Sequence, residues 1–115
     1  MLVDPEIINE EDSENITYCQ AITQTLEYAL ESDDSVILLG EDIADPAGGV
    51  VKATYGLSSK FGLERVRPTP ISEQAIIGAA IGASMAGLRP VAEIIVNDFL
   101  GVCMDQVTNH AAKLR

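Results

Sequence analysis

The sequence predicts an α/β fold with a parallel sheet and flanking helices. A short, unbroken apolar run at residues 36–39 lies between acidic turn residues and Gly40, which is typical of a strand buried on both faces. A second apolar run at residues 91–96 follows a long apolar segment of helical length, so strand, helix and strand occur in the order of a βαβ unit. The 115 residues, 47% of them hydrophobic, suffice for one packed domain.

A first helix is expected before this strand, from Thr17 to about Ser32. Thr17 and Gln20 have the spacing of a capping box, in which each side chain binds the backbone N–H of the other residue. Four apolar residues then recur at helical spacing: Ile22, Leu26, Ala29 and Leu30. The cap and the apolar stripe together predict the first helix of the domain.

The segment after the first strand predicts a loop, a short helix and a very short strand. Residues 42–50 are rich in Gly, Pro and Asp, which favours a loop leaving the carboxyl end of the strand. Residues 55–61 predict a short helix that ends at the glycine after it. Val66 begins the short strand, and Pro68 and Pro70 then keep the backbone extended.

A long apolar helix is expected to open at Glu73, with the Ser72 hydroxyl as its N-terminal cap. Residues 75–86 are apolar on nearly every face, which predicts a helix buried in the core. Gly87 ends this helix, and Pro90 prevents its continuation into the strand at 91–96.

A last helix is expected from Asp98, still running at Arg115. One face of this helix carries its apolar residues: Val102, Val107, Ala111 and Leu114.

Charge and composition exclude several classes of partner and site. Eighteen acidic and seven basic residues give a net charge of −11, which repels nucleic acid and anionic membrane surfaces. Residues 1–15 are expected to form an acidic flexible tail without a signal-peptide pattern, which favours the cytoplasm. The most apolar stretch, residues 76–88, is too short to span a bilayer. Cys19, Cys103 and His110 have no metal-binding spacing, so both thiols are expected to be free and no metal site is predicted.

Glu73 is the strongest candidate for chemistry. Its apolar surroundings disfavour the ionised carboxyl, whereas the helix N-terminus favours it, so its protonation depends on what docks against it. Two interpretations stay open: an acid or base, or an ordinary first-turn glutamate that satisfies free backbone amides. No nucleophile is predicted, because Ser72 lacks an accompanying base.

A series of short runs occurs in a characteristic order along the chain. They are Leu-Leu-Gly-Glu-Asp (38–42), Gly-Gly-Val (48–50), Gly-Leu-Ser-Ser-Lys-Phe-Gly (56–62), Arg-Val-Arg-Pro-Thr-Pro-Ile-Ser-Glu (65–73), Ala-Gly-Leu-Arg-Pro-Val (86–91) and Asp-Gln-Val-Thr-Asn-His-Ala-Ala-Lys-Leu-Arg (105–115). Together they resemble the beta subunit of thiamine-diphosphate-dependent 2-oxoacid dehydrogenases, the decarboxylating component of the pyruvate, branched-chain and acetoin complexes. The resemblance implies that residues 16–115 are the N-terminal part of a transketolase-like pyrimidine-binding domain, which is incomplete here.

The resemblance also implies roles for individual residues. The glutamate matching Glu73 hydrogen-bonds the pyrimidine ring of thiamine diphosphate and promotes its imino tautomer, which takes the proton from the thiazolium carbon. Ile71 and Ile95 would line the pyrimidine pocket, although core packing explains both equally well. Phe99 would stack on the aminopyrimidine ring. Glu41 would lie near the cofactor, with a solvated loop acid as the alternative.

The same resemblance implies partners and a reaction. An alpha subunit would hold magnesium and share the cofactor in an assembly of two alpha and two beta subunits. The reaction would be oxidative decarboxylation of pyruvate or a branched-chain 2-oxoacid, with acyl transfer to lipoamide. A domain absent here would dock on the lipoyl acyltransferase core, so activity is expected only with the alpha subunit and in the full-length chain. In a eukaryote the site of action would be the mitochondrial matrix, although no transit peptide is seen.

Two alternatives stay open beside this interpretation. One is a fragment of a transketolase or a deoxyxylulose-phosphate synthase, which shares the fold and the glutamate role. The other is a non-catalytic, truncated remnant that only binds a partner subunit.

Overall fold

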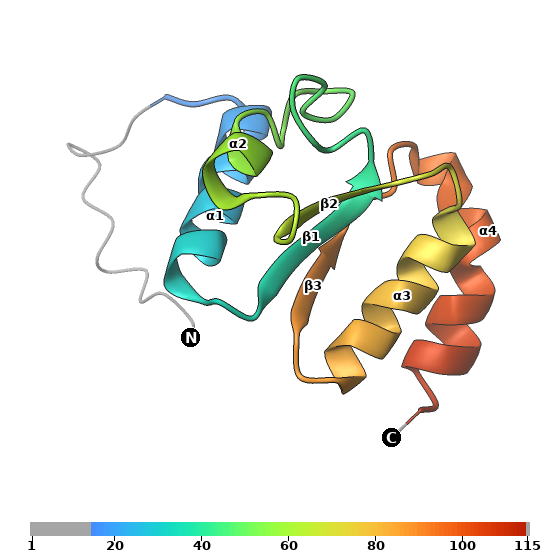
Figure 1. The fold of residues 1–115 in the computed structure, drawn as a ribbon. Helices are drawn as coiled ribbons and strands as arrows, with labels where there is room; N and C mark the ends of the chain where they lie inside the picture. Colours follow the sequence, from blue (N-terminus) through green and yellow to red (C-terminus); the bar gives the residue numbers. More distant parts are fainter. Residues whose placement is uncertain (1–14, 115) are drawn as a thin grey trace, which may run out of the picture.

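A parallel sheet with strand order β2-β1-β3 lies between two layers of helices in the computed structural model, which describes residues 15–114 (Figure 1). The strands are β1 (Val36–Glu41), β2 (Val66–Thr69) and β3 (Arg89–Ala92). The helices are α1 (Tyr18–Ser32), α2 (Leu57–Phe61), α3 (Glu73–Met85), the 3-10 turn η3 (Asn97–Phe99), α4 (Leu100–Asp105) and the π-helical turn η4 (Gln106–Ala111). The predicted α/β fold is confirmed, whereas the acidic tail lies, except for Asn15, outside the described residues.

The capping box at the start of α1 is formed as predicted. The Gln20 N–H donates to the Thr17 hydroxyl at 3.2 Å, and the Thr17 N–H donates to the Gln20 side-chain oxygen at 2.8 Å. Such a cap stabilises a helix by about 1 kcal/mol. The helix ends at Ser32 and buries Leu30 against the sheet.

The central strand β1 divides the core in two. All six of its residues are buried, and successive side chains point to opposite faces. Val36 and Leu38 pack with α1 and α2, which cover one face (Figure 1). Ile37 and Leu39 pack with α3 on the other face. The unbroken apolar run therefore predicted a doubly covered parallel strand correctly.

Both strands that flank β1 contain a proline. Pro68 lies in β2 and Pro90 lies in β3, each at an edge of the described sheet. The Arg89 N–H donates to the carbonyl of Ser35, just before β1, and the Glu93 N–H donates to the carbonyl of Leu39 in β1, both at 2.8 Å. Alternate residues of a strand direct their N–H groups to opposite sides. Because Arg89 and Glu93 donate toward β1, the N–H that Pro90 lacks would have pointed away from β1.

The predicted bounds of β3 and the predicted cap of α3 are wrong. β3 covers Arg89–Ala92 rather than residues 91–96, because its last backbone hydrogen bond to β1 is donated by Glu93 and the chain then turns toward η3. Ser72 occupies the N-cap position, but its hydroxyl donates to the Pro70 carbonyl at 2.9 Å instead of capping the helix.

Two helices differ from the predictions in burial and length. α3 begins at Glu73 as predicted, but only Ile76 and Ala80 are buried, so most of its apolar surface is open in the described part of the chain. The last helix ends at Ala111 rather than continuing. Its predicted apolar face is exposed, and the residue buried in α4 is Cys103. The π-helical turn η4 inserts an extra residue per turn and so rotates the face that follows.

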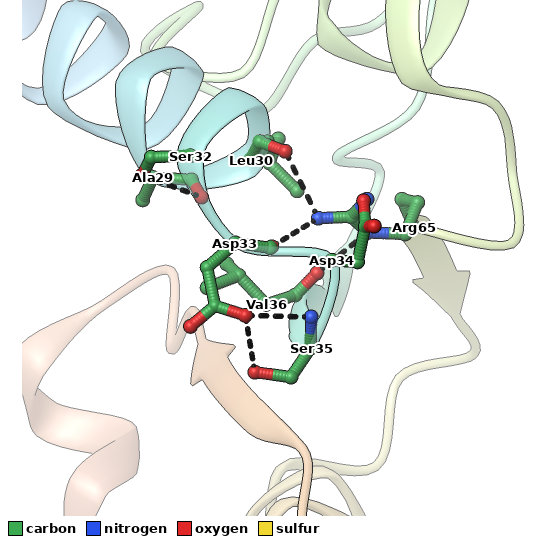
Figure 2. A network of polar contacts seen from close by, with 8 residues as sticks. All are labelled: Ala29, Leu30, Ser32, Asp33, Asp34, Ser35, Val36 and Arg65. Carbon is green, nitrogen blue, oxygen red and sulfur yellow. Dashed lines mark hydrogen bonds and ion pairs between the residues drawn. The ribbon is translucent and has the colours of Figure 1, made fainter.

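Arg65 joins three carbonyls where α1 passes into β1 (Figure 2). Its Nε donates to the Val36 carbonyl at 2.7 Å, and its Nη2 donates to the carbonyls of Leu30 at 3.1 Å and Asp33 at 2.8 Å. The Asp33 carboxylate accepts from the Ser35 N–H at 2.8 Å, which shapes the same turn. Hydrogen bonds from Ser35 and the charges of Arg89 and Arg65 lower the pKa of Asp33.

Replacement of Arg65 by Ala is expected to lower the free energy of unfolding by about 3 kcal/mol, because half-buried carbonyls lose a charged donor. Urea denaturation measures this loss. Arg67→Ala is the matched control, since Arg67 is exposed and its Nε donates to the nearby Glu64 carbonyl at 2.7 Å. Equal effects of the two substitutions would contradict the anchoring role of Arg65.

Candidate functional site

Polar side chains gather at the carboxyl edge of the sheet. Glu41 is the last residue of β1, and Thr69, the last residue of β2, stands opposite it in the register. Glu93 follows β3 directly. The carboxyl ends of the strands are where open parallel sheets place their ligands, so this edge is the candidate site.

Glu41 connects the central strand to the start of α3. Its side chain is buried, with 7% of the residue exposed, so it is not a solvated loop acid. Its Oε1 accepts a hydrogen bond from the Ser72 N–H at 3.3 Å. Because Ser72 immediately precedes Glu73, this contact fixes the chain at the point where the helix begins.

Glu73 is the first residue of α3 and lies beside α4. Burial raises the pKa of the Cys103 thiol in α4, and the negative charge of Glu73 raises it further. The Cys103 thiol also donates to the Phe99 carbonyl at 3.6 Å. A hollow of about 650 Å³ runs between the two helices, with Glu73 on one side and Val102 and Gln106 on the other.

The three apolar site candidates lie outside both hydrophobic clusters of the sheet. Ile71 is 83% exposed, Phe99 is 43% exposed, and Ile95 is half-buried. Ile94, next to Ile95, packs on the α3 face of the sheet instead. Core packing therefore does not account for Ile71, Ile95 or Phe99 in the described part of the chain.

Sequence reasoning missed Glu93 and Thr69. Glu93 Oε2 and Thr69 Oγ1 are buried and have no hydrogen-bond partner among the described residues. Burial raises the pKa of Glu93, and the nearby charge of Glu41 adds to the effect. A carboxylate directly after a parallel strand indicates the carboxyl edge of the sheet, so Glu93 could have been predicted as a site residue. Because the strand was predicted to run to residue 96, Glu93 was placed inside it.

A loop held by Asp45 borders the site. The Asp45 carboxylate accepts hydrogen bonds from the Ser59 hydroxyl at 2.6 Å and from the Gly56 N–H at 2.7 Å, and further ones from Ser58 and the Ser59 N–H. These hydrogen bonds hold the pKa of Asp45 well below its usual range. The loop places Gly49 beside Glu93: a Cβ built on Gly49 would lie 3.7 Å from each oxygen of the Glu93 carboxyl.

Residues 14–115 match the family model of the transketolase pyrimidine-binding domain. The chain belongs to this family. The match covers the described sheet and helices, so the carboxyl edge with Glu41 and Glu73 is part of a transketolase-type pyrimidine-binding domain.

Curated relatives of this pyrimidine-binding domain are beta subunits. Acetoin:2,6-dichlorophenolindophenol oxidoreductase subunit beta of Bacillus subtilis (strain 168) is 44% identical, over 87% of this chain and 32% of the relative. 2-Oxoisovalerate dehydrogenase subunit beta of the same organism is 45% identical, over 87% of this chain and 30% of the relative. The mitochondrial pyruvate dehydrogenase E1 component subunit beta of Bos taurus is 45% identical, over 85% of this chain and 27% of the relative. The resemblance is thus confirmed, and the chain spans between 27% and 32% of the length of these relatives.

Three further findings concern residues 15–114. Cys19 and Cys103 are free thiols, as predicted. The same residues contain no cluster of three or more His, Cys, Asp or Glu side chains suited to a metal ion. None of the helices described combines the length and the hydropathy needed to cross a membrane.

Proposed function

We propose that this chain is the first part of a 2-oxoacid dehydrogenase beta subunit and that Glu73 activates thiamine diphosphate there. The observation that carries the proposal is the contact of the buried Glu41 with the Ser72 N–H, which positions Glu73 at an open helix start. The beta-subunit relatives support the same assignment. Residues 16–115 are accordingly the N-terminal part of the pyrimidine-binding domain.

The donor set at the carboxyl edge fits a flat, polar aromatic ring. Glu73 offers a carboxyl group, the exposed Phe99 offers an aromatic face, and Ile71 and Ile95 offer apolar walls outside the core clusters. Among residues 15–114 the buried oxygens of Thr69 and Glu93 have no hydrogen-bond partner, which leaves hydrogen-bonding capacity at this edge for a ligand. When bound, thiamine diphosphate supplies an acidic carbon that adds to the carbonyl group of the substrate.

The chain's own residues contribute proton transfer and orientation. Glu73, the first residue of α3, exchanges a proton with a ring nitrogen through a carboxyl oxygen. Glu41 fixes the backbone before Glu73, so the carboxyl group keeps one orientation. Ile71 and Phe99 exclude water from the ring and so strengthen the hydrogen bond at Glu73.

An alpha subunit completes the site in this proposal. It supplies magnesium and the diphosphate contacts in an assembly of two alpha and two beta chains. The substrate is a 2-oxoacid such as pyruvate or a branched-chain homologue, and the acyl group passes to lipoamide. The subunit docks on the lipoyl acyltransferase core through residues outside this chain, and its compartment is the cytoplasm or, in a eukaryote, the mitochondrial matrix. The beta-subunit names of the relatives support the pairing with an alpha subunit.

The test assembles the complete beta subunit with its alpha subunit and measures thiamine diphosphate binding and 2-oxoacid decarboxylation. Cofactor-dependent decarboxylation of pyruvate or 3-methyl-2-oxobutanoate is the expected result. Ketol transfer between sugar phosphates would point to a transketolase or a deoxyxylulose-phosphate synthase instead. Pairing of the subunits without any increase in cofactor affinity would identify a non-catalytic remnant.

Replacement of Phe99 by Ala in the complete subunit is expected to weaken thiamine diphosphate binding about five- to tenfold, which corresponds to a lost stacking contact of about 1 kcal/mol. The thermal midpoint is expected to change little, because Phe99 lies outside both core clusters. Phe61→Ala is the matched control, since Phe61 packs against the α1 face of the core. If Phe99→Ala lowers the midpoint as Phe61→Ala does and leaves affinity unchanged, the cofactor role of Phe99 is wrong.

A further inference from the structure

Two glycines leave room for the side chain of Glu93. A Cβ built on Gly40 would lie 3.0 Å from the Cβ of Glu93, and a Cβ built on Gly49 would lie 3.7 Å from each of its carboxyl oxygens. The Glu93 N–H donates to the Leu39 carbonyl at 2.8 Å, so the sheet fixes the backbone. The carboxyl oxygen Oε2, in contrast, is buried and has no hydrogen-bond partner among the described residues.

Glu93 also lines a mainly apolar cavity of about 240 Å³ between α1 and the sheet. The hydroxyl of Thr54, another polar group in its wall, already donates to a backbone carbonyl at 2.8 Å. Three further side chains in the wall are exposed, namely Ile22 of α1, Val51 of the loop and Val91 of β3. A group from outside therefore has access to the cavity and to the carboxyl group in its wall.

No cation within residues 15–114 neutralises Glu93. The lysine and arginine side chains in this part of the chain bond to backbone carbonyls, to an amide oxygen or to other carboxylates: Lys52, Lys60, Arg65, Arg67, Arg89 and Lys113. Burial raises the pKa of Glu93, and the charge of Glu41 makes a smaller contribution in the same direction. Both effects are those of a carboxyl group that lacks a counter-charge.

A carboxyl oxygen in the wall of an apolar cavity fits a lysine or arginine side chain. The aliphatic stem of such a residue packs on apolar surface, while its cationic head forms a strong hydrogen bond to a carboxylate. An apolar cavity of about 150 Å³ holds a benzene molecule, so the larger cavity beside Glu93 has room for the stem. The net charge of −11 favours a cationic partner as well.

We propose that Glu93 forms an ion pair with a lysine or arginine side chain of the alpha subunit, whose stem enters this cavity. Glu93 directly follows β3 at the carboxyl edge of the sheet, which is the edge that the alpha subunit completes in the proposed function. The inference rests on that function, because it names a contact between the same two subunits.

This ion pair is separate from the proposed cofactor contacts. Successive side chains of β1 alternate between the two faces of the sheet, so Glu41 points with Leu39 toward α3. Glu93 lines a cavity that α1 covers on the other face. A group that occupies this cavity therefore leaves Glu73, at the start of α3, free to contact the cofactor.

The first experiment measures the dissociation constant of the complete beta and alpha subunits without cofactor. Glu93→Gln is expected to weaken assembly about ten- to hundredfold, the usual effect of losing a hydrogen bond to a charged group. Glu64→Gln removes one negative charge from the exposed turn before β2 and is expected to leave assembly unchanged. Equal dissociation constants for the two variants would overturn the ion pair.

A second pair of substitutions tests the cavity. Ile22→Trp enlarges a side chain in the cavity wall and is expected to weaken assembly at least tenfold, by about the factor expected for Glu93→Gln, because it takes the volume of the incoming stem. Thr25→Trp is the matched control on α1, since Thr25 lines a neighbouring hollow instead. Undiminished assembly of Ile22→Trp would show that no partner side chain enters the cavity.

The parent subunits provide a further measurement that needs no substitution. A cation beside Glu93 lowers the pKa that burial raises, so Glu93 releases a proton to the buffer on assembly. Affinity for the alpha subunit is therefore expected to rise with pH up to the pKa of Glu93 in the free subunit. Calorimetry in two buffers of different ionisation enthalpy measures the release. Equal proton release by the parent and Glu93→Gln would contradict the proposal.

Thermal midpoints and cofactor binding separate the remaining outcomes. If another part of the beta subunit supplies the cation, Glu93→Gln lowers the midpoint of the complete beta subunit alone and leaves the dissociation constant unchanged, which overturns the proposal. If the variants assemble with the expected differences but no thiamine diphosphate binds, the proposed function fails and the ion pair stands. If the cofactor binds and Glu93→Gln assembles as the parent does, the ion pair fails alone.

Discussion

Glu73→Gln in the complete subunit is expected to reduce the decarboxylation rate by about a hundred- to ten-thousand-fold, the usual contribution of a positioned acid or base. An amide has the shape of the carboxyl group but cannot pass the proton to a ring nitrogen. Assembly with the alpha subunit is expected to persist, because Glu73 is absent from both hydrophobic clusters. Single-turnover decarboxylation and exchange of the thiazolium proton measure the loss.

Glu64→Gln serves as the control for the loss of one negative charge. Glu64 is exposed in the turn before β2, away from the carboxyl edge of the sheet. Its substitution is expected to leave both rates unchanged. Near-normal proton exchange in Glu73→Gln would remove the acid–base role from Glu73.

Gly48→Ala is expected to lower the free energy of unfolding by about 3 kcal/mol, as backbone strain and overpacking add. Gly48 has a φ of +64°, which favours glycine, and a Cβ there would lie 2.5 Å from the Cα of Tyr55. The clash involves backbone, so no rotation of a side chain relieves it. Urea denaturation measures the loss, and cofactor affinity is expected to fall too, because the loop borders Glu93.

Gly82→Ala provides the opposite control on the same chain. Gly82 lies in α3, and a Cβ there meets nothing within 4 Å. Alanine at this position is expected to stabilise the helix by up to about 1 kcal/mol. If Gly48→Ala lowers the free energy of unfolding no more than Gly82→Ala does, close packing of Gly48 against Tyr55 does not stabilise the loop.

The sequence predicted correctly those helices and strands that depend on residues close together in the chain. The capping box of Thr17 and Gln20 predicted the start of α1, and the apolar run before Gly40 predicted the buried strand β1. The bounds of β3 depend instead on hydrogen bonds to Ser35 and Leu39, which lie far away in sequence. An apolar run alone does not show which of its residues make such bonds.

The site was predicted in part for the same reason. Glu73 and Glu41 stand in recognisable runs, and Glu41 ends a strand that the sequence places correctly. Glu93 became visible only when the true end of β3 placed it directly after that strand, at the carboxyl edge of the sheet. The last helix passes into the π-helical turn η4 and ends at Ala111, and since such a turn has no signature in a single sequence, the predicted continuation of the helix was wrong.

The contacts of Arg65 have a consequence for the order in which the chain folds. The carbonyls that it binds lie 29 to 35 residues earlier in the chain. During synthesis, α1 and β1 leave the ribosome before Arg65, so these three hydrogen bonds at their junction form only after Arg65 has been added. We therefore expect amides at this junction to gain protection from hydrogen exchange together with β2, as one cooperative unit, rather than with α1 alone.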